Sequence, residues 1–179
     1  MSRIPAVDPN SASAPVKTLL NGVQKGLGAT PNLFRVAAQS PAVLEALVAL
    51  FAATGKGTLN GRTREAIALA ASEANACDYC LSAHTALGKQ AGLSDDAIGQ
   101  ARAAKSDEAH LAALLHLTRA VVDRRGRIGG GLDEARREGV TDAEVVEVVA
   151  NVALTTFTNY LNEVAGTDID FPVVRHLAR

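Results

Sequence analysis

The sequence predicts an all-α protein that folds as one compact domain of about seven to nine helices. Of the 179 residues, 34 are alanine, which is the strongest helix former among the amino acids. Apolar residues recur at the helical spacing of three and four positions through nearly the whole chain. Aromatic residues make up only 3%, and the β-branched and aromatic runs that form strands are scarce. We therefore expect helices and no extensive sheet.

The length of 179 residues is that of a single domain with enough chain to bury a core. Residues 1–14 are polar and rich in proline and serine, and we interpret them as a flexible N-terminal arm. The helical pattern starts directly after this segment. We therefore assign residues 15–179 to one helical domain.

Caps and turn residues divide the first half of the chain into four helices. Gly28 ends the first of them. The pairs Thr30-Pro31 and Ser40-Pro41 each place a capping side chain before a proline at the first helical position, which opens the second and third helices. A glycine-rich turn precedes the fourth helix, which is apolar along one face. The predicted helices span residues 16–27, 31–39, 42–54 and 63–75.

Up to five further helices follow in the second half. Acidic capping segments at residues 94–96 and 106–108 open two of them, because carboxylates there face the positive end of the helix dipole. A glycine-rich linker occupies residues 126–131. Thr141 and Glu144 have the spacing of a capping box, which opens the last and longest helix. The predicted helices, caps included, span residues 79–91, 94–104, 106–125, 132–138 and 141–164.

Charge and hydropathy exclude several classes of function. The net charge of -1 and the pI of about 6.4 argue against a nucleic-acid-binding surface. The longest apolar stretch, residues 43–53, contains Glu45 and is too short to span a membrane. The first residues lack the apolar core of a signal peptide. We therefore expect a cytoplasmic protein with neither a nucleic acid nor a membrane as its partner.

One segment carries the residues that are capable of chemistry. Both cysteines of the chain, Cys77 and Cys80, lie three apart at the predicted start of a helix. Free N–H groups and the positive dipole end favour a thiolate there, and the spacing lets Cys77 resolve an oxidised Cys80. His84 follows Cys80 by one helical turn on the same face, where an imidazole can relay a proton. The pattern favours a redox-active dithiol.

Two carboxylates compete as the base for this thiol pair. Glu73 precedes Cys77 by four residues, so spacing along a straight helix favours it. Glu65 precedes Cys77 by twelve residues and would lie roughly 15–18 Å away along a straight helix. Glu65 reaches the thiols only if the chain bends back on itself.

Three other interpretations of the pair remain open. Cys77, Cys80 and His84 are three possible metal ligands, and Glu65 or Glu73 would complete a zinc site. The two cysteines can also be inert parts of an apolar core. A third interpretation is a non-catalytic redox sensor or disulfide-exchange module, in which the disulfide changes the binding of a partner.

The spacing of four residues resembles the signature of a known family. Glu65, Cys77, Cys80 and His84 follow the pattern Glu-x11-Cys-x2-Cys-x3-His of the alkylhydroperoxidase D (AhpD) family, within the carboxymuconolactone decarboxylase-like superfamily. Decarboxylase members lack the cysteine pair, which disfavours decarboxylation. Further segments resemble the peroxidase-related branch, and they extend the resemblance over about residues 30–172: Pro31-Asn32-Leu33-Phe34, Thr158-Asn159-Tyr160 and Asp170-Phe171-Pro172.

The resemblance implies an AhpD-like fold and a role for each residue of the signature. Cys80 would be the peroxidatic thiol and Cys77 the resolving thiol, with Glu65 as general base and His84 in the proton relay. The best-known members carry a second histidine just before the second cysteine, where this chain has Tyr79. A phenol donates a hydrogen bond but does not act as a base near neutral pH.

The resemblance also implies the reaction and the partners. It indicates a thiol-dependent peroxidase that reduces a hydroperoxide through a Cys77–Cys80 disulfide and needs no metal, flavin or other cofactor. In the family the reductant is a dithiol, the dihydrolipoyl group of a protein partner. The family assembles as homo-oligomers, either trimers or hexamers.

Overall fold

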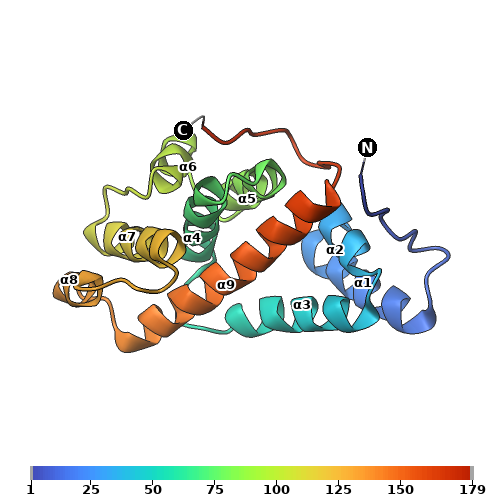
Figure 1. Cartoon of the computed structure of the whole chain (residues 1–179), viewed down its shortest axis with the longest axis horizontal. Coiled ribbons are helices and arrows are strands. Elements are labelled where there is room, and N and C mark those ends of the chain that lie inside the picture. The colour runs from blue at the N-terminus through green and yellow to red at the C-terminus, as the bar shows by residue number, and fades with distance from the viewer. Residues whose placement is uncertain (1, 178–179) are drawn as a thin grey trace.

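A computed structural model describes residues 2–177 and folds them into nine helices, with no strand among those residues (Figure 1). The all-α class, the AhpD-like helical architecture and the expected number of helices are confirmed. Each predicted helix is present, with ends that differ by a few residues at most. The helices are α1 (Ala14–Leu27), α2 (Asn32–Ala37), α3 (Pro41–Thr54), α4 (Gly61–Ala74), α5 (Asp78–Gln90), α6 (Asp95–Arg102), α7 (Ala109–Arg124), α8 (Gly131–Arg137) and α9 (Asp142–Ala165).

Helix α4 is the centre of the packing. It contacts α5, α6, α7 and α9, and its residues from Ala66 to Ala71 are all buried. Four of these six are alanines, whose small side chains let the neighbouring helices approach closely. The alanines of α4 therefore allow other helices to pack against nearly every side of it.

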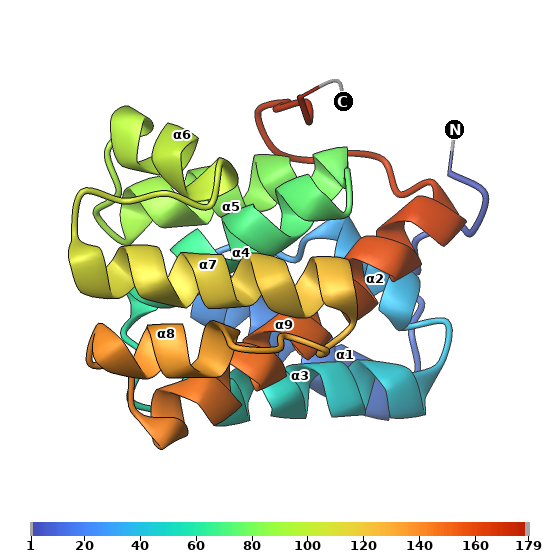
Figure 2. The same ribbon diagram turned by 60° about the vertical axis from the view of Figure 1, so that its left-hand side comes forward.

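Helix α9 crosses the domain, with α1, α2 and α3 on one side and α4 to α7 on the other (Figure 1). Its capping box is present, since the Thr141 hydroxyl accepts from the Glu144 N–H while the Glu144 carboxylate accepts from the Thr141 N–H. Helices α7 and α8 lie side by side on the face that Figure 2 turns forward. Because α9 contacts both groups of helices, it joins them into one fold.

Buried apolar side chains form two clusters. The larger one is built mainly from α4, α7 and α9, and the other from α1, α2, α3 and part of α5. Cys77, Tyr79 and Cys80 belong to the second cluster. The predicted thiol pair therefore lies in the apolar interior, where the N-terminal helices meet α5.

The segment before α1 has no helix and lies against two elements of the domain. The Arg3 N–H donates to the Ala165 carbonyl at 2.6 Å, and the Val7 N–H donates to the Arg35 carbonyl at 3.0 Å. Helix α1 begins at Ala14, next to the predicted boundary between residues 14 and 15. Within residues 2–177, none of the helices is long and apolar enough to cross a lipid bilayer.

Candidate active site

The turn between α4 and α5 folds the two helices back against each other. The Ala76 N–H donates to the Glu73 carbonyl at 3.2 Å and the Cys77 N–H to the Ser72 carbonyl at 3.0 Å, which is the bonding of a Schellman motif. Ala76 adopts the left-handed conformation that this motif requires, with φ of 54°. The chain thus reverses direction immediately before Cys77, as the involvement of Glu65 requires.

This reversal brings Glu65 of α4 against His84 of α5. The His84 Nδ1 and the Glu65 Oε2 lie 2.8 Å apart, between side chains that are 14% and 22% exposed. Gly88 lies one turn after His84 on α5, and a Cβ atom there would lie 3.1 Å from the Leu93 side chain, so the close packing of Leu93 on α5 favours glycine at this position. Burial lowers the pKa of His84, but the charge and the hydrogen bond of Glu65, together with the charge of Cys80, outweigh burial and raise that pKa.

Cys77 and Cys80 are free thiols at the N-terminus of α5. Cys77 is the N-cap residue, and its sulfur accepts from the Cys80 N–H at 3.4 Å. The two sulfur atoms lie 2.9 Å apart, with Cys77 donating to Cys80. A small movement would close a disulfide, whose bond length is about 2.05 Å. Because the exposed fractions are 0% for Cys77 and 3% for Cys80, the pair is shielded from bulk water.

The surroundings make the two thiols unequal. Burial raises the pKa of the Cys80 thiol, but the hydrogen bond from Cys77 and the positive charge of His84 lower it, to about 7. The hydrogen bond to Cys80 and burial raise the pKa of the Cys77 thiol. Of the two thiols, Cys80 is therefore the one that ionises near neutral pH, while Cys77 keeps its proton.

A cavity of about 570 Å³ opens beside Cys80. Cys80, His84 and Glu65 line it, whereas Cys77 does not. The rest of its wall is mostly apolar and comes largely from α1, α2 and α3, with Phe34 and Phe51 among its side chains. A small organic molecule in this cavity therefore meets the thiolate of Cys80 and the Glu65–His84 pair, but not the second thiol.

Tyr79 has a structural role in this arrangement. Its hydroxyl donates to the Asp170 Oδ1 at 2.8 Å and accepts from the Leu33 N–H at 3.0 Å. The Asp170 Oδ2 accepts from the Asn32 N–H at 2.8 Å, at the start of α2. Burial raises the pKa of the Tyr79 phenol further above its usual range. Tyr79 therefore joins α5 to α2 and to the C-terminal segment, and its hydroxyl stays protonated and does not act as a base.

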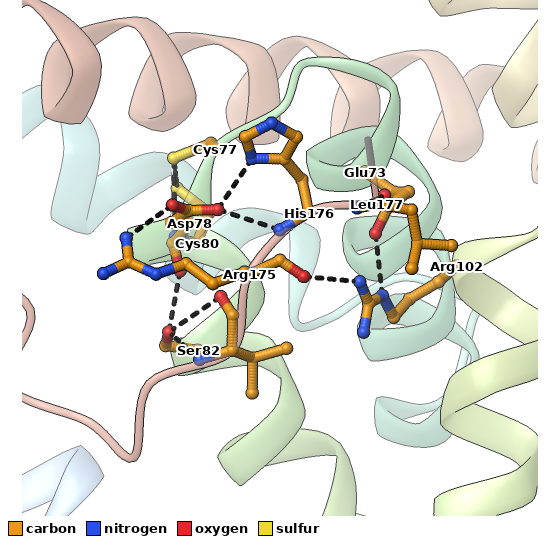
Figure 3. Close-up of polar contacts among 10 residues, drawn as sticks. Glu73, Cys77, Asp78, Cys80, Ser82, Arg102, Arg175, His176 and Leu177 are labelled. Carbon is orange, nitrogen blue, oxygen red and sulfur yellow. Dashed lines mark hydrogen bonds and ion pairs between the residues drawn. The ribbon is translucent and has the colours of Figure 1, made fainter. Parts of the chain in front are cut away.

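Glu73, the alternative base, faces away from the cavity. Its carboxylate accepts from the Arg102 guanidinium and from the Leu177 N–H, each at 2.7 Å. Figure 3 shows this pair beside the C-terminal segment, apart from the two sulfur atoms. Glu73 is not among the residues that line the cavity. The straight-helix hypothesis that favoured Glu73 is therefore wrong, because the turn at Ala76 redirects α5.

The C-terminal segment, residues 167–177, runs across the N-terminal end of α5 as a strap (Figure 3). Asp78 binds the Arg175 guanidinium at 2.7 Å and both the backbone N–H and the Nδ1 of His176 at 2.8 Å. The Ser82 hydroxyl accepts from the Val174 N–H at 2.9 Å. These contacts explain why the non-cysteine positions of the motif carry Asp78 and Ser82, which the sequence alone left unassigned.

Two asparagines of α9 were missed as site residues by the pattern. The Asn162 side-chain N–H points at the Cys80 sulfur, with 3.3 Å between Nδ2 and Sγ. Asn159, one turn earlier, is fully buried and donates to the Ser72 hydroxyl at 3.2 Å. One signal in the sequence could have found them. Buried positions of a core helix are normally apolar, so polar residues on the inward face of α9 indicate a role other than packing.

The four residues of the signature thus lie close together where α4 and α5 pack against each other. Glu65 and His84 form one contacting pair and Cys77 and Cys80 form another, and all of them except Cys77 line the cavity. Among residues 2–177, no group of three or more histidine, cysteine, aspartate or glutamate side chains is placed to hold a metal ion. The arrangement suits thiolate chemistry coupled to proton transfer.

Comparison with known proteins supports the fold. The model of the carboxymuconolactone decarboxylase family matches residues 41–123, which contain all four residues of the signature. The sequence matches no curated protein.

Solved structures share the fold over most of the chain. A peroxidase-related protein from Ralstonia eutropha JMP134, described as an alkylhydroperoxidase AhpD core, is 24% identical with a TM-score of 0.83, over 94% of this chain and 92% of that one. A peroxidase-related protein from Silicibacter sp. TM1040 is 22% identical with a TM-score of 0.80, over 92% and 88%. The debrominase Bmp8, solved with 2,3,4-tribromopyrrole, is 20% identical with a TM-score of 0.80, over 93% and 91%.

At these identities the solved structures show a shared fold. The family model matches the segment of the sequence that contains the cysteine pair. The match and the fold agree with the resemblance that the four-residue spacing predicted. Over residues 41–123 the chain is therefore similar to the carboxymuconolactone decarboxylase family, and its fold is the one seen in AhpD-like, peroxidase-related proteins.

Proposed function

We propose that the protein is a thiol-dependent peroxidase that reduces organic hydroperoxides through a Cys77–Cys80 dithiol and disulfide cycle. The observation that carries the proposal is the pair of sulfur atoms 2.9 Å apart, of which only Cys80 lines the apolar cavity. The lowered pKa of Cys80, about 7, favours the nucleophilic thiolate near neutral pH. We include a cytoplasmic location, where free thiols stay reduced, in this proposal.

The reaction begins with proton transfer at Cys80. His84, held by Glu65, takes the thiol proton, and the thiolate then attacks the terminal oxygen of the hydroperoxide. The O–O bond breaks, Cys80 becomes a sulfenic acid, and the departing alkoxide takes the proton back from His84 as it leaves as an alcohol. The peroxide is thereby reduced by two electrons and the sulfur oxidised by two.

Cys77 completes the cycle. Its sulfur attacks the sulfur of the Cys80 sulfenic acid, a disulfide forms, and the hydroxyl leaves as water with the Cys77 proton. An external dithiol then reduces the disulfide through a mixed disulfide. We propose that this dithiol is a slender group, such as the lipoyl arm of a partner protein, because Cys80 is only 3% exposed.

A homo-oligomer is part of the same proposal. One face of α9 is exposed and apolar along most of its length. Exposed fractions on this stripe run from 41% to 68%, at Val146, Val149, Phe157, Tyr160 and Val164. Their spacing of three, eight, three and four residues keeps them on one side of the helix. We propose that a second copy of the chain covers this stripe in a trimer or hexamer.

A second candidate function is the thiol-dependent removal of a halogen from an aromatic ring. The fold shared with the debrominase Bmp8 and the phenylalanine-lined cavity favour it. In that reaction the ring loses bromide and gains a proton, while Cys77 and Cys80 give up two electrons and form the same disulfide. Both candidates therefore need the dithiol, and they differ in the electron acceptor.

An intact-mass and free-thiol measurement tests the proposal. The reduced protein receives one equivalent of cumene hydroperoxide or of 2,3,4-tribromopyrrole, without a reductant. Loss of two thiols and two hydrogens within seconds of the peroxide, with cumyl alcohol as product, supports the peroxidase. Oxidation by the bromopyrrole alone, with bromide release, supports the dehalogenase instead.

Variants assign the roles of the two sulfurs. Cys80→Ser should abolish consumption of the peroxide, whereas Cys77→Ser should trap Cys80 as a sulfenic acid that dimedone labels. Turnover with dihydrolipoamide separates an enzyme from a redox sensor, which would be oxidised once and not cycle. Full activity in Cys80→Ser would overturn the assignment of the nucleophile.

A further inference from the structure

The contact between Asn162 and Cys80 is unusual because it brings a polar amide into the apolar interior. Asn162 lies on α9 and is 3% exposed, and its Nδ2 lies 3.3 Å from the Cys80 sulfur. A neutral thiol is a weak acceptor, whereas a thiolate accepts a charge-assisted hydrogen bond. The contact therefore favours the ionised form of Cys80 over the protonated form.

The same amide leaves its other polar atom without a partner. Among residues 2–177, the Asn162 Oδ1 is one of three buried side-chain atoms that make no hydrogen bond. A buried unsatisfied carbonyl costs stability, and a leucine of similar volume would fill the space without that cost. Packing alone thus does not explain an asparagine here, whereas an N–H directed at Cys80 does.

Hydrogen bonds of the neighbouring Asn159 fix the helix that carries the Asn162 amide. Asn159 lies one turn before Asn162 on α9, and its side chain accepts from the Asn75 amide at 2.8 Å and donates to the Ser72 hydroxyl. Asn75 and Ser72 belong to the turn and the end of α4 that precede Cys77. The network fastens α9 to the segment that carries the cysteines, so the donor is placed before any reaction occurs.

We propose that Asn162 is a catalytic residue whose side-chain N–H stabilises the thiolate of Cys80 and thereby makes Cys80 the nucleophile of the pair. The inference rests on the proposed function only in taking Cys80 as the reacting sulfur. Two further observations agree with it. The side-chain amides of Asn162 and Asn159 both lower the pKa of Cys80, whereas the Cys77 sulfur accepts from the backbone N–H of Cys80, at 3.4 Å, and from no side-chain amide within residues 2–177.

Other charged or titratable groups also face the pair, and the test must hold them constant. On α5 these are Cys77, His84 and Tyr79, and on α4 Glu65 acts through His84. On α9, Glu163 raises the pKa of Cys77. Asp170 of the strap acts on Tyr79. Substitution of Asn162 changes none of these side chains.

The test measures the rate of alkylation of Cys80 by iodoacetamide as a function of pH, with mass spectrometry to separate Cys80 from Cys77. Asn162→Leu removes the donor at similar volume, and Asn162→Asp replaces the N–H by an anionic oxygen. Loss of one charge-assisted hydrogen bond should raise the pKa of Cys80 by about one unit, which lowers the thiolate fraction at pH 7 about five-fold. Asn162→Asp should raise it further.

Asn151→Ala is the matched control. Asn151 is another buried asparagine of α9, and its side chain donates to the Glu147 carbonyl rather than to a group near the thiols. This variant should leave the midpoint of Cys80 alkylation unchanged. An unchanged midpoint in Asn162→Leu and Asn162→Asp would overturn the proposal.

The wild-type protein offers a measurement that needs no folded variant. The Asn162 side-chain amide protons should shift in the NMR spectrum with the same midpoint as Cys80 alkylation, and this shift should vanish after Cys80 is alkylated. Absence of any titration of these protons would also overturn the proposal. Because neither assay uses a peroxide, failure of the peroxidase leaves this result standing and can be told apart from it.

Discussion

Glu65→Gln should slow the reaction of Cys80 with a hydroperoxide while leaving the fold intact. The Glu65 carboxylate lies 2.8 Å from His84 Nδ1, between side chains that are 22% and 14% exposed. A glutamine keeps the shape and can still accept from the imidazole, so only the charge is lost. A hydrogen bond to a charged group contributes about 1.5–3 kcal/mol, which corresponds to roughly a 10- to 150-fold slower step.

The pKa of His84 determines how the effect of Glu65→Gln on stability depends on pH. Since Glu65 raises the pKa of His84 above its ordinary value of 6.5, the wild-type imidazolium persists to higher pH than it does in the variant. The stabilisation from the pair is fully present below the unfolded pKa of His84 and is lost as the pH rises through the folded pKa. The difference in stability between the two proteins should therefore be largest below about pH 6.5 and should vanish as the pH rises through the folded pKa of His84.

Glu73→Gln is the matched control, because it changes the other candidate base. Glu73 pairs with Arg102 between side chains that are 9% and 16% exposed. Its neutralisation should lower the free energy of unfolding by about 1–3 kcal/mol, since a buried guanidinium loses its charged partner. The thiol reaction should stay within about two-fold of wild type.

Stopped-flow measurement of single-turnover peroxide reduction, together with urea unfolding, separates the two effects. The reasoning requires that Glu65→Gln lose rate and Glu73→Gln lose stability. A larger loss of rate in Glu73→Gln than in Glu65→Gln would refute the geometry proposed for proton transfer.

Three other substitutions test the turn, the strap and the stripe. Ala76→Gly should raise the free energy of unfolding by about 1 kcal/mol, because glycine adopts a φ of 54° without strain; a fall in stability on urea unfolding would contradict this. Asp78→Ala should speed hydrogen exchange at the His176 amide about ten-fold. Unchanged exchange in Asp78→Ala would rule out the strap contact. Arg175 and His176 together outweigh burial and lower the pKa of Asp78. The contribution of Asp78 to stability is therefore present above about pH 3.8 and is lost as the pH falls through the folded pKa. Tyr160→Glu should convert the oligomer to a monomer in light scattering, whereas Val173→Glu, equally exposed but outside α9, should not; an oligomer that survives Tyr160→Glu places the interface elsewhere.

The sequence by itself determined the fold class and nearly every helix. Caps, prolines and glycines act over a few residues, so the openings at Ser40-Pro41 and Thr141 to Glu144 were readable without tertiary contacts. The resemblance to the family and the four residues of the signature were likewise readable, because Cys77, Cys80 and His84 lie within three turns of one helix and the spacing to Glu65 is specific.

Spacing along a straight helix favoured Glu73 and the resemblance implied Glu65, and the tertiary structure shows which of the two carboxylates reaches the site. Glu73 is nearer to Cys77 in sequence, but the left-handed Ala76 reverses the chain, directs Glu73 to Arg102 and brings Glu65 to His84. No periodicity within a single helix reports such a reversal, since the left-handed residue is an alanine rather than the glycine that usually signals it.

Contacts between distant elements were equally beyond the sequence. Asn162 follows Cys80 by 82 residues, and Asp170 follows Tyr79 by 91. Which side chains face a thiol from another helix depends on how α9 and the strap pack against α5, and packing of that kind is decided by the whole core. The sequence determined which residues are capable of thiol chemistry, and the tertiary structure decided which groups surround them, because proximity across helices is set by packing and not by spacing along the chain.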